Sequence, residues 1–318
     1  MTCRDHCLLY ALIVVIGLVR IYALPDFCTI KTEYDDAAPD YCEEREQPHL
    51  GCNNKNKFAA ACGEHAEIFP MTDNVKRLIV RQHNVYRNIV AQRSLHLLPT
   101  ASRMLKVKWD TNLAQLAEYA VKKCSIKRPT SSFSTTMASK PGFNAIYNKY
   151  PKQQEQDEIK ILGSQLKAWY DEYRRTTTES LLSGRSPDGR DVSHFIQLIT
   201  GLNDRVGCAI VKYEQDKWKI QLMICLYGCY KQNNQVTYAI GYLPGDKCKC
   251  GSDRQFKNLC SNEETVGDCA MIKNHNLVNE EFEPTTTTTA TRPKIRKTRK
   301  RSPIERLIDW IARQKISN

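Results

Sequence analysis

Three stretches of the chain carry apolar residues at intervals of three, four and seven, the spacing of an amphipathic helix. The first is expected to begin at Thr72 or Asp73, either of which can act as its N-cap. The second follows Asp110, another natural N-cap, and ends with Cys124 on its apolar face. The third is predicted over residues 156–174, and Glu172 lies one step off its apolar stripe, where it could face a cleft. The stripe of this third helix comprises Ile159, Leu162, Leu166, Trp169, Tyr170 and Tyr173.

Three β-rich runs follow the helices, at residues 206–213, 218–227 and 236–242. The polar segment 214–217 predicts a hairpin between the first two, which would bring Cys208 and Cys225 near each other across the strands. Residues 125–157 are rich in Ser, Thr, Lys and Pro and are predicted to be a long loop. Helices first and antiparallel strands after them favour a layered α+β domain.

Residues 193–208 connect the two halves of this pattern. A short apolar helix carrying His194 is expected to stop at Gly201, and a strand opens with Gly207 and Cys208. One side chain that can titrate or bind a metal is therefore held beside a predicted disulfide anchor.

The N-terminus predicts export. An apolar run of twelve residues from Leu8 to Val19 is too short to cross a bilayer as a helix, and Ala23 offers a small residue for cleavage. We interpret residues 1–23 as a signal peptide and expect no transmembrane segment in the mature chain. The alternative is a membrane anchor extended through Tyr22, but Arg20 would interrupt its apolar stretch.

Cysteine usage favours the same compartment. Of 14 cysteines, Cys3 and Cys7 leave with the signal and 12 remain, an even number typical of a disulfide framework in an exported chain. No pair of Cys-x-x-Cys elements with matched spacing occurs, so a structural zinc site is not expected.

Charge is concentrated in the C-terminal tail. From Pro284 onward ten Lys and Arg face only Glu305 and Asp309, which accounts for eight of the net charge of +12. The middle of the chain is therefore nearly balanced, and the basic pI does not indicate nucleic-acid binding. The tail predicts a Thr-rich spacer, a basic run at 296–301 able to attract glycosaminoglycan or anionic lipid, and a short amphipathic helix.

Ordered motifs then carry a family resemblance. They include Cys52-Asn53-Asn54, His83-Asn84-x-x-Arg87, Val107-x-Trp109-Asp110, Gly142-x-Asn144, Trp169-x-x-Glu172, His194-Phe195-x-Gln197 and Val206-Gly207-Cys208. The chain resembles the CAP superfamily of cysteine-rich secretory, antigen 5 and pathogenesis-related proteins, and most closely its insect antigen 5-like branch. The resemblance implies a three-layer α-β-α sandwich with a mainly antiparallel central sheet.

The resemblance also implies disulfide pairings. It joins Cys42 with Cys52, Cys62 with Cys124, Cys208 with Cys225, and Cys248 with Cys260. The partners of Cys28, Cys229, Cys250 and Cys269 stay open.

Two departures from the family pattern bear on function. Members of the superfamily often place two histidines and two acidic residues around a cleft, a set able to hold zinc. Here Glu172 and His194 match, whereas the first histidine's place falls near Arg128 and the first acidic residue corresponds to Phe143. Neither Arg nor Phe can ligate a cation, so no metal and no other cofactor is expected.

We therefore expect a secreted, extracellular binding module without catalytic residues. The resemblance implies a lipid or sterol, or an extracellular protein receptor, as its partner. The alternative is a secreted peptidase or esterase that uses Glu172 and His194. Against it, neither a Gly-x-Ser-x-Gly elbow nor a His-Glu-x-x-His motif occurs.

The expected organisation has five parts. A signal peptide at 1–23 precedes a cysteine-containing segment at 24–71 and the CAP domain at 72–245. A cysteine-containing extension at 246–283 and a Thr-rich, basic tail at 284–318 follow. His83, Asn84, Arg87, Gly142 and Asn144 are the family-signature residues of the central domain. On physical grounds, residues 83–87 are expected to satisfy buried backbone groups or one another, not to do chemistry.

Overall fold

The computed structural model describes residues 48–63, 65–95, 98–231, 235–267 and 269. The expected signal peptide, Cys28, Cys42 and the basic tail all lie outside the described residues. Within them, no helix has both the length and the apolar character needed to span a membrane.

The central sheet consists of antiparallel strands in the order β1-β5-β6-β4, and β3 pairs with β5 in parallel. Their bounds are β1 Glu67–Ile68, β3 Lys108–Trp109, β4 Gly142–Pro151, β5 Arg205–Gln215 and β6 Trp218–Tyr227. In the β5–β6 hairpin Cys208 lies directly opposite Cys225, and the two are joined by a disulfide. The hairpin therefore forms where the sequence predicts it.

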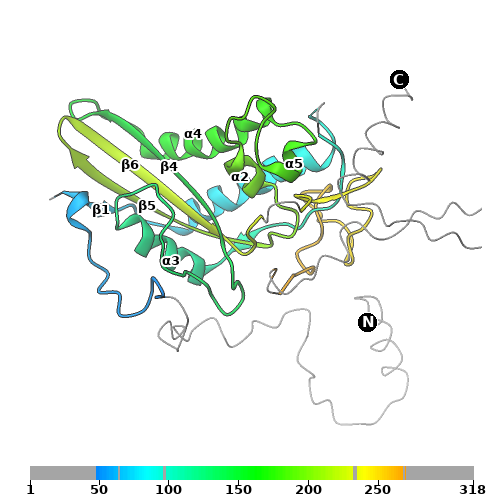
Figure 1. Ribbon diagram of the computed structural model, residues 1–318, viewed down its shortest axis with the longest axis horizontal. Helices are drawn as coiled ribbons and strands as arrows, with labels where there is room; N and C mark the ends of the chain where they lie inside the picture. Colours follow the sequence, from blue (N-terminus) through cyan, green and yellow to red (C-terminus); the bar gives the residue numbers. More distant parts are fainter. Residues whose placement is uncertain (1–47, 64, 96–97, 232–234, 268, 270–318) are drawn as a thin grey trace, which may run out of the picture. The chain divides into compact units, whose positions relative to one another are not determined.

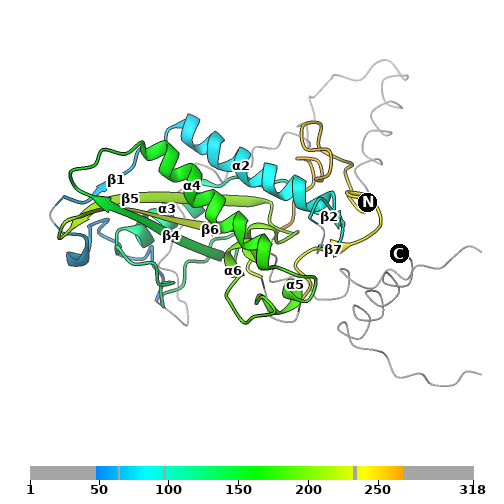
Figure 2. The same ribbon diagram turned by 90° about the horizontal axis from the view of Figure 1, so that it is seen from above.

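Helices cover both faces of this sheet (Figures 1 and 2). The helices α2 (Asp73–Ala91), α4 (Glu158–Asp171) and α6 (Ser193–Leu198) belong to one hydrophobic core, and α3 (Thr111–Val121) belongs to the other. Two short 3-10 helices, η1 (Ala60–Cys62) and η2 (Glu172–Arg175), and the short helix α5 (Ser180–Ser183) complete the helical elements of the described residues. The α+β sandwich is the fold that the sequence predicts.

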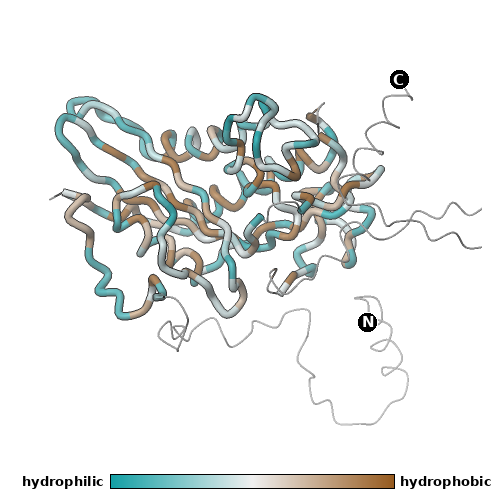
Figure 3. Tube along the Cα trace, in the orientation of Figure 1, coloured by the Kyte–Doolittle hydropathy of each residue, from teal (hydrophilic) through white to brown (hydrophobic). Residues whose placement is uncertain are grey.

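Side-chain alternation along β5 and β6 builds the two cores. Cys208 and Ile210 face α2, α4 and α6, whereas Ala209 and Val211 between them face α3. Both faces of these strands are buried, so they read as nearly continuous apolar runs. Figure 3 shows hydrophobic colours along the middle of the hairpin strands and hydrophilic colours at their outer turns.

The helices begin where capping side chains allow. The Thr72 hydroxyl accepts a hydrogen bond from Val75 N, and Asp110 Oδ1 accepts one from Leu113 N at 2.8 Å. Asp157 caps α4 in the same way. Helix α4 is shorter than predicted, because η2 takes over at Glu172, and Ile161 is buried where Ile159 was expected.

One loop prediction was wrong, and one strand prediction holds over only part of its length. Residues 142–151, expected to belong to a long loop, form β4, which pairs with β6 along its whole length. Within residues 236–242, expected to be a β-rich run, only β7 (Ala239–Ile240) is a strand, and it pairs with β2 (Ala101–Arg103) in a separate two-stranded sheet. In β4 the polar residues hide the strand pattern, because an edge strand has one side open to solvent.

Candidate functional site

The signature residues of α2 are structural anchors, each fully buried. The Asn84 amide brackets the backbone of Val107, donating to its carbonyl at 3.0 Å and accepting from its amide at 2.9 Å. His83 Nδ1 lies 2.8 Å from the Ile79 carbonyl, so Nδ1 carries the proton and Nε2 accepts from the Tyr227 hydroxyl at 3.0 Å. Burial lowers the pKa of His83 to about 4, which keeps the ring neutral.

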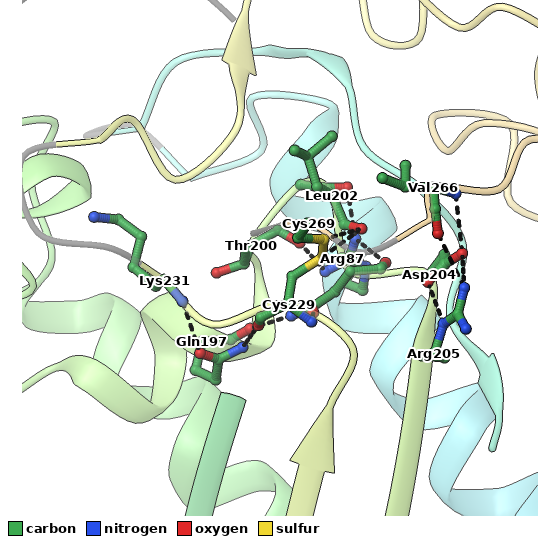
Figure 4. The surroundings of a disulfide bond; sticks show 12 residues. Arg87, Gln197, Thr200, Leu202, Asp204, Arg205, Cys229, Lys231, Val266 and Cys269 are labelled. Carbon is green, nitrogen blue, oxygen red and sulfur yellow. Dashed lines mark hydrogen bonds and ion pairs between the residues drawn. A yellow bond between two sulfur atoms is a disulfide. The ribbon is translucent and has the colours of Figure 1, made fainter. Parts of the chain in front are cut away.

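Arg87 organises the loop that follows α6. Its guanidinium donates to five backbone carbonyls, those of Leu105, Leu198, Thr200, Gly201 and Asn203. Burial lowers its pKa to about 9. Figure 4 shows Arg87 beside the Cys229–Cys269 disulfide and the Asp204–Arg205 ion pair, so several parts of the chain converge on this side chain.

Gly142 and Asn144 fix the start of β4 against α6. A Cβ at Gly142 would lie 2.3 Å from Gln197 Nε2, so only glycine fits beside that side chain. The Asn144 amide donates to the His194 carbonyl at 2.9 Å and to the Tyr227 hydroxyl at 3.3 Å. Tyr227 thus links His83 to Asn144. The sequence gives no sign of this role, because Tyr227 is the last residue of an apolar strand.

Glu172 and His194 meet, as their matching positions in the family pattern imply. His194 Nδ1 donates to Glu172 Oε1 at 2.8 Å, and the Phe195 amide donates to Glu172 Oε2 at 2.9 Å. Glu172 therefore caps the N-terminal turn of α6, and Asp191 accepts a bond from the Ser193 amide. The His194 ring stacks on Trp169 with 6.3 Å between ring centroids.

The charge state of His194 depends on Glu172. Burial acts to lower the pKa of His194, but the hydrogen bond and the negative charge of Glu172, with a contribution from Asp191, raise it above its ordinary value overall. The pair is only partly exposed, with 33% of the His194 side chain and 12% of the Glu172 side chain open to solvent.

Arg128 and Phe143 lie beside each other, and neither side chain offers a ligand atom for a cation. The Arg128 guanidinium is 4.6 Å from the Phe133 ring centroid, 5.9 Å from that of Phe143 and 5.2 Å from that of Tyr230. Phe143 packs into the core on the α3 side, whereas its neighbour Asn144 points to α6. Where the resemblance places two family ligands, the structure has a positive charge beside three aromatic rings.

Disulfides tie the outer segments to this framework. The structure joins Cys62 with Cys124, Cys208 with Cys225, and Cys248 with Cys260, the pairings that the resemblance implies. It also joins Cys229 with Cys269, which the sequence left open. Cys52 and Cys250 are disulfide-bonded as well, and Cys42, the expected partner of Cys52, lies outside the described residues.

One cluster of metal-competent side chains occurs in the described part of the chain. It comprises Cys248, Cys260 and Glu264. The two sulfurs are joined to each other, and Glu264 accepts from Arg103 and from the Lys249 amide. This cluster holds the C-terminal extension against β2 and has no thiolate for a metal.

Comparison with known proteins identifies the family. Residues 80–227 match the model of the cysteine-rich secretory protein (CAP) family. The antigen 5-like allergen Cul n 1 of Culicoides nubeculosus is 35% identical over 171 residues, which cover 54% of this chain and 76% of that protein. The chain belongs to the CAP family, in its antigen 5-like branch.

Other CAP proteins match over a longer stretch. Venom allergen-1 of Aedes albopictus is 28% identical over 243 residues, covering 71% of this chain and 89% of the relative. Tabinhibitin 6 of Tabanus yao is 29% identical over 240 residues, covering 72% and 89%. Among solved structures, NaASP2 with Zn²⁺ aligns at a TM-score of 0.47 and 21% identity, over 60% of this chain and 97% of that one.

Proposed function

We propose that this CAP protein is a secreted, non-catalytic binding protein that engages an extracellular protein through the surface around Arg128. The observation that carries the non-catalytic part is the state of Glu172. Both of its carboxylate oxygens are engaged within the protein, one by His194 and one by the Phe195 amide. Glu172 is thus occupied in capping α6 and in orienting His194, which supports a structural role for the pair.

The surface around Arg128 supports a protein partner. Arg128 and Tyr230 are both exposed, and the rings of Phe133 and Phe143 pack against the guanidinium. Arg128 uses one nitrogen to donate to the Pro141 carbonyl, which leaves other N–H groups available for a partner. Arginine and tyrosine held in place by packed neighbours are typical of interface hot spots.

The relatives fit this proposal. Several members that match this chain are named tabinhibitins, and the name denotes inhibition. A secreted inhibitor acts by binding, which needs a rigid surface and no turnover. The disulfide framework and the apolar segment at residues 8–19 support export of the chain.

One experiment distinguishes a binding protein from a hydrolase, and a protein partner from a lipid ligand. The full-length secreted protein is tested against an array of purified extracellular receptor domains. Arg128→Ala is expected to weaken binding to a receptor by about 30-fold, the effect of losing a hot spot. Lys123→Ala, which removes an exposed charge near the end of α3, serves as the control and should leave affinity unchanged.

Two outcomes contradict the proposal. Turnover of a peptide or ester that disappears in His194→Ala would make the protein a hydrolase. A stoichiometric co-purifying sterol or lipid, retained in Arg128→Ala with no receptor bound, would assign the chain to lipid carriage.

A further inference from the structure

A groove beside α2 gathers positive charge. It lies between α2 and the segment that contains β3, and it encloses about 480 Å³. Five basic side chains line it, Lys76, Arg77, Arg81, Lys106 and Lys108, and no acidic side chain does. We call it the α2 groove. Figure 2 shows α2 as the outermost helix on its face of the sheet, with the C-terminal extension near its end.

The positive charge of the α2 groove is incompletely neutralised. Lys106 forms an ion pair with Asp253 at 2.9 Å, and Lys76 lies 3.5 Å from the exposed Asp73. Among the described residues, Arg77 donates only to the neutral Asn74 side chain, and Lys108 Nζ donates to the Asn262 carbonyl at 2.8 Å. Arg81 forms no ion pair within the described part of the chain.

The pKa of Lys108, which lines the α2 groove, lies below its ordinary value. Burial is the main cause that lowers it, Arg205 and Lys106 lower it further, and Asp204 opposes them. A lysine surrounded in this way gains from an added negative charge. A bound anion would therefore stabilise groups already present in the groove.

Spacing and wall chemistry indicate the shape of the ligand. Arg77 and Arg81 are one turn apart on the same side of α2, about 6 Å along its axis, and both are exposed. Trp109, half-buried, and Phe256, buried, supply flat apolar walls to the groove. An acyl chain needs an enclosed apolar channel, whereas this groove is bordered by exposed polar side chains. An extended chain with repeated anionic groups and flat apolar ring faces fits better.

We propose that the α2 groove binds a sulfated polysaccharide, with sulfate groups on Arg77, Arg81 and Lys108 and a sugar ring against Trp109. This site is independent of the proposed protein-binding surface, because the two share no residue. It is also distinct from the basic tail, since every residue that lines it lies in the folded domain.

Heparin affinity at about 150 mM salt, the physiological ionic strength, tests the proposal on the full-length chain. Arg77→Ala/Arg81→Ala is expected to weaken binding about ten-fold, since two partly screened charge contacts are lost. Arg77→Lys/Arg81→Lys should retain most of the affinity. Lys123→Ala/Lys160→Ala removes the same charge from exposed positions on other elements and should change nothing. Desulfated heparin should not bind.

The basic tail is itself expected to attract heparin, so each variant is also made in a chain whose basic residues at 296–301 are replaced by neutral ones. The ten-fold loss should appear in both backgrounds. Equal binding by the groove variant and the wild type, with thermal stability unchanged, would refute the proposal. So would an equal loss in the Lys123/Lys160 control. Binding of the groove to anionic phospholipid vesicles but not to heparin would instead make it a membrane site and overturn the assignment.

Discussion

Replacing Arg87 tests whether one buried side chain holds the loop that follows α6, the helix that carries His194. Arg87→Met keeps much of the side-chain volume but removes every donor. The carbonyls of Thr200 and Gly201 keep backbone partners, the Asn203 and Leu105 amides. Those of Leu105, Leu198 and Asn203 lose the donor that Arg87 supplies.

The magnitude follows from these three carbonyls. A buried acceptor left without its partner costs about 1–3 kcal/mol, and water entering beside a smaller side chain relieves part of that cost. We expect Arg87→Met to lower the free energy of unfolding by about 4 kcal/mol, the sum of three such costs near the low end of that range. That is a large share of the roughly 5–15 kcal/mol that stabilises an ordinary domain.

Urea denaturation of the disulfide-intact protein, followed by tryptophan fluorescence, measures the change. Arg87→Lys keeps the charge but brings fewer donors, so it should cost about half as much. Arg81→Met removes the same groups from an exposed position earlier on α2, and we expect a change below about 0.5 kcal/mol. If Arg87→Met unfolds within about 1 kcal/mol of the wild type, the carbonyl network does not hold the loop.

Three further predictions concern the rest of the site. The folded-state pKa of His83 lies near 4, below its ordinary 6.5, so the free energy of unfolding should fall by about 3 kcal/mol as pH drops from 6.5 to 4. Urea midpoints measured across this pH range should show the fall, and it should be smaller in His83→Gln. In Glu172→Gln the pKa of His194 should fall, and an unchanged NMR titration would contradict the assigned ion pair. Gly207→Ala should destabilise by about 3 kcal/mol or more in thermal unfolding, because its Cβ would lie 2.2 Å from Ala114 N; Gly163→Ala, with open space around it, should not destabilise the protein.

The sequence was most informative where one local signal sufficed. Thr72 and Asp110 predict helix starts, because capping is a short-range interaction between a side chain and the next turn of the chain. Cys208 and Cys225 can be placed opposite each other because the hairpin between them is short and regular. The same locality explains the success of the α+β prediction.

Only part of the candidate site could be predicted from local sequence signals. Glu172 and His194 could be named as matching positions, but their contact depends on α4 and α6 packing side by side. That Glu172 also caps α6 could not be foreseen, since the capping residue is 23 positions before the amide it binds. Long-range capping has no sequence pattern.

By itself the sequence determined the helix starts, the hairpin, the apolar faces and the family resemblance, since each depends on neighbours within a few turns of chain. Only the tertiary structure decided that residues 142–151 form an edge strand, that Arg128 sits among three aromatic rings, and that five cations share one groove. The physical reason is that strand pairing and the summation of charge join residues far apart in the chain, and their spacing exists only after folding.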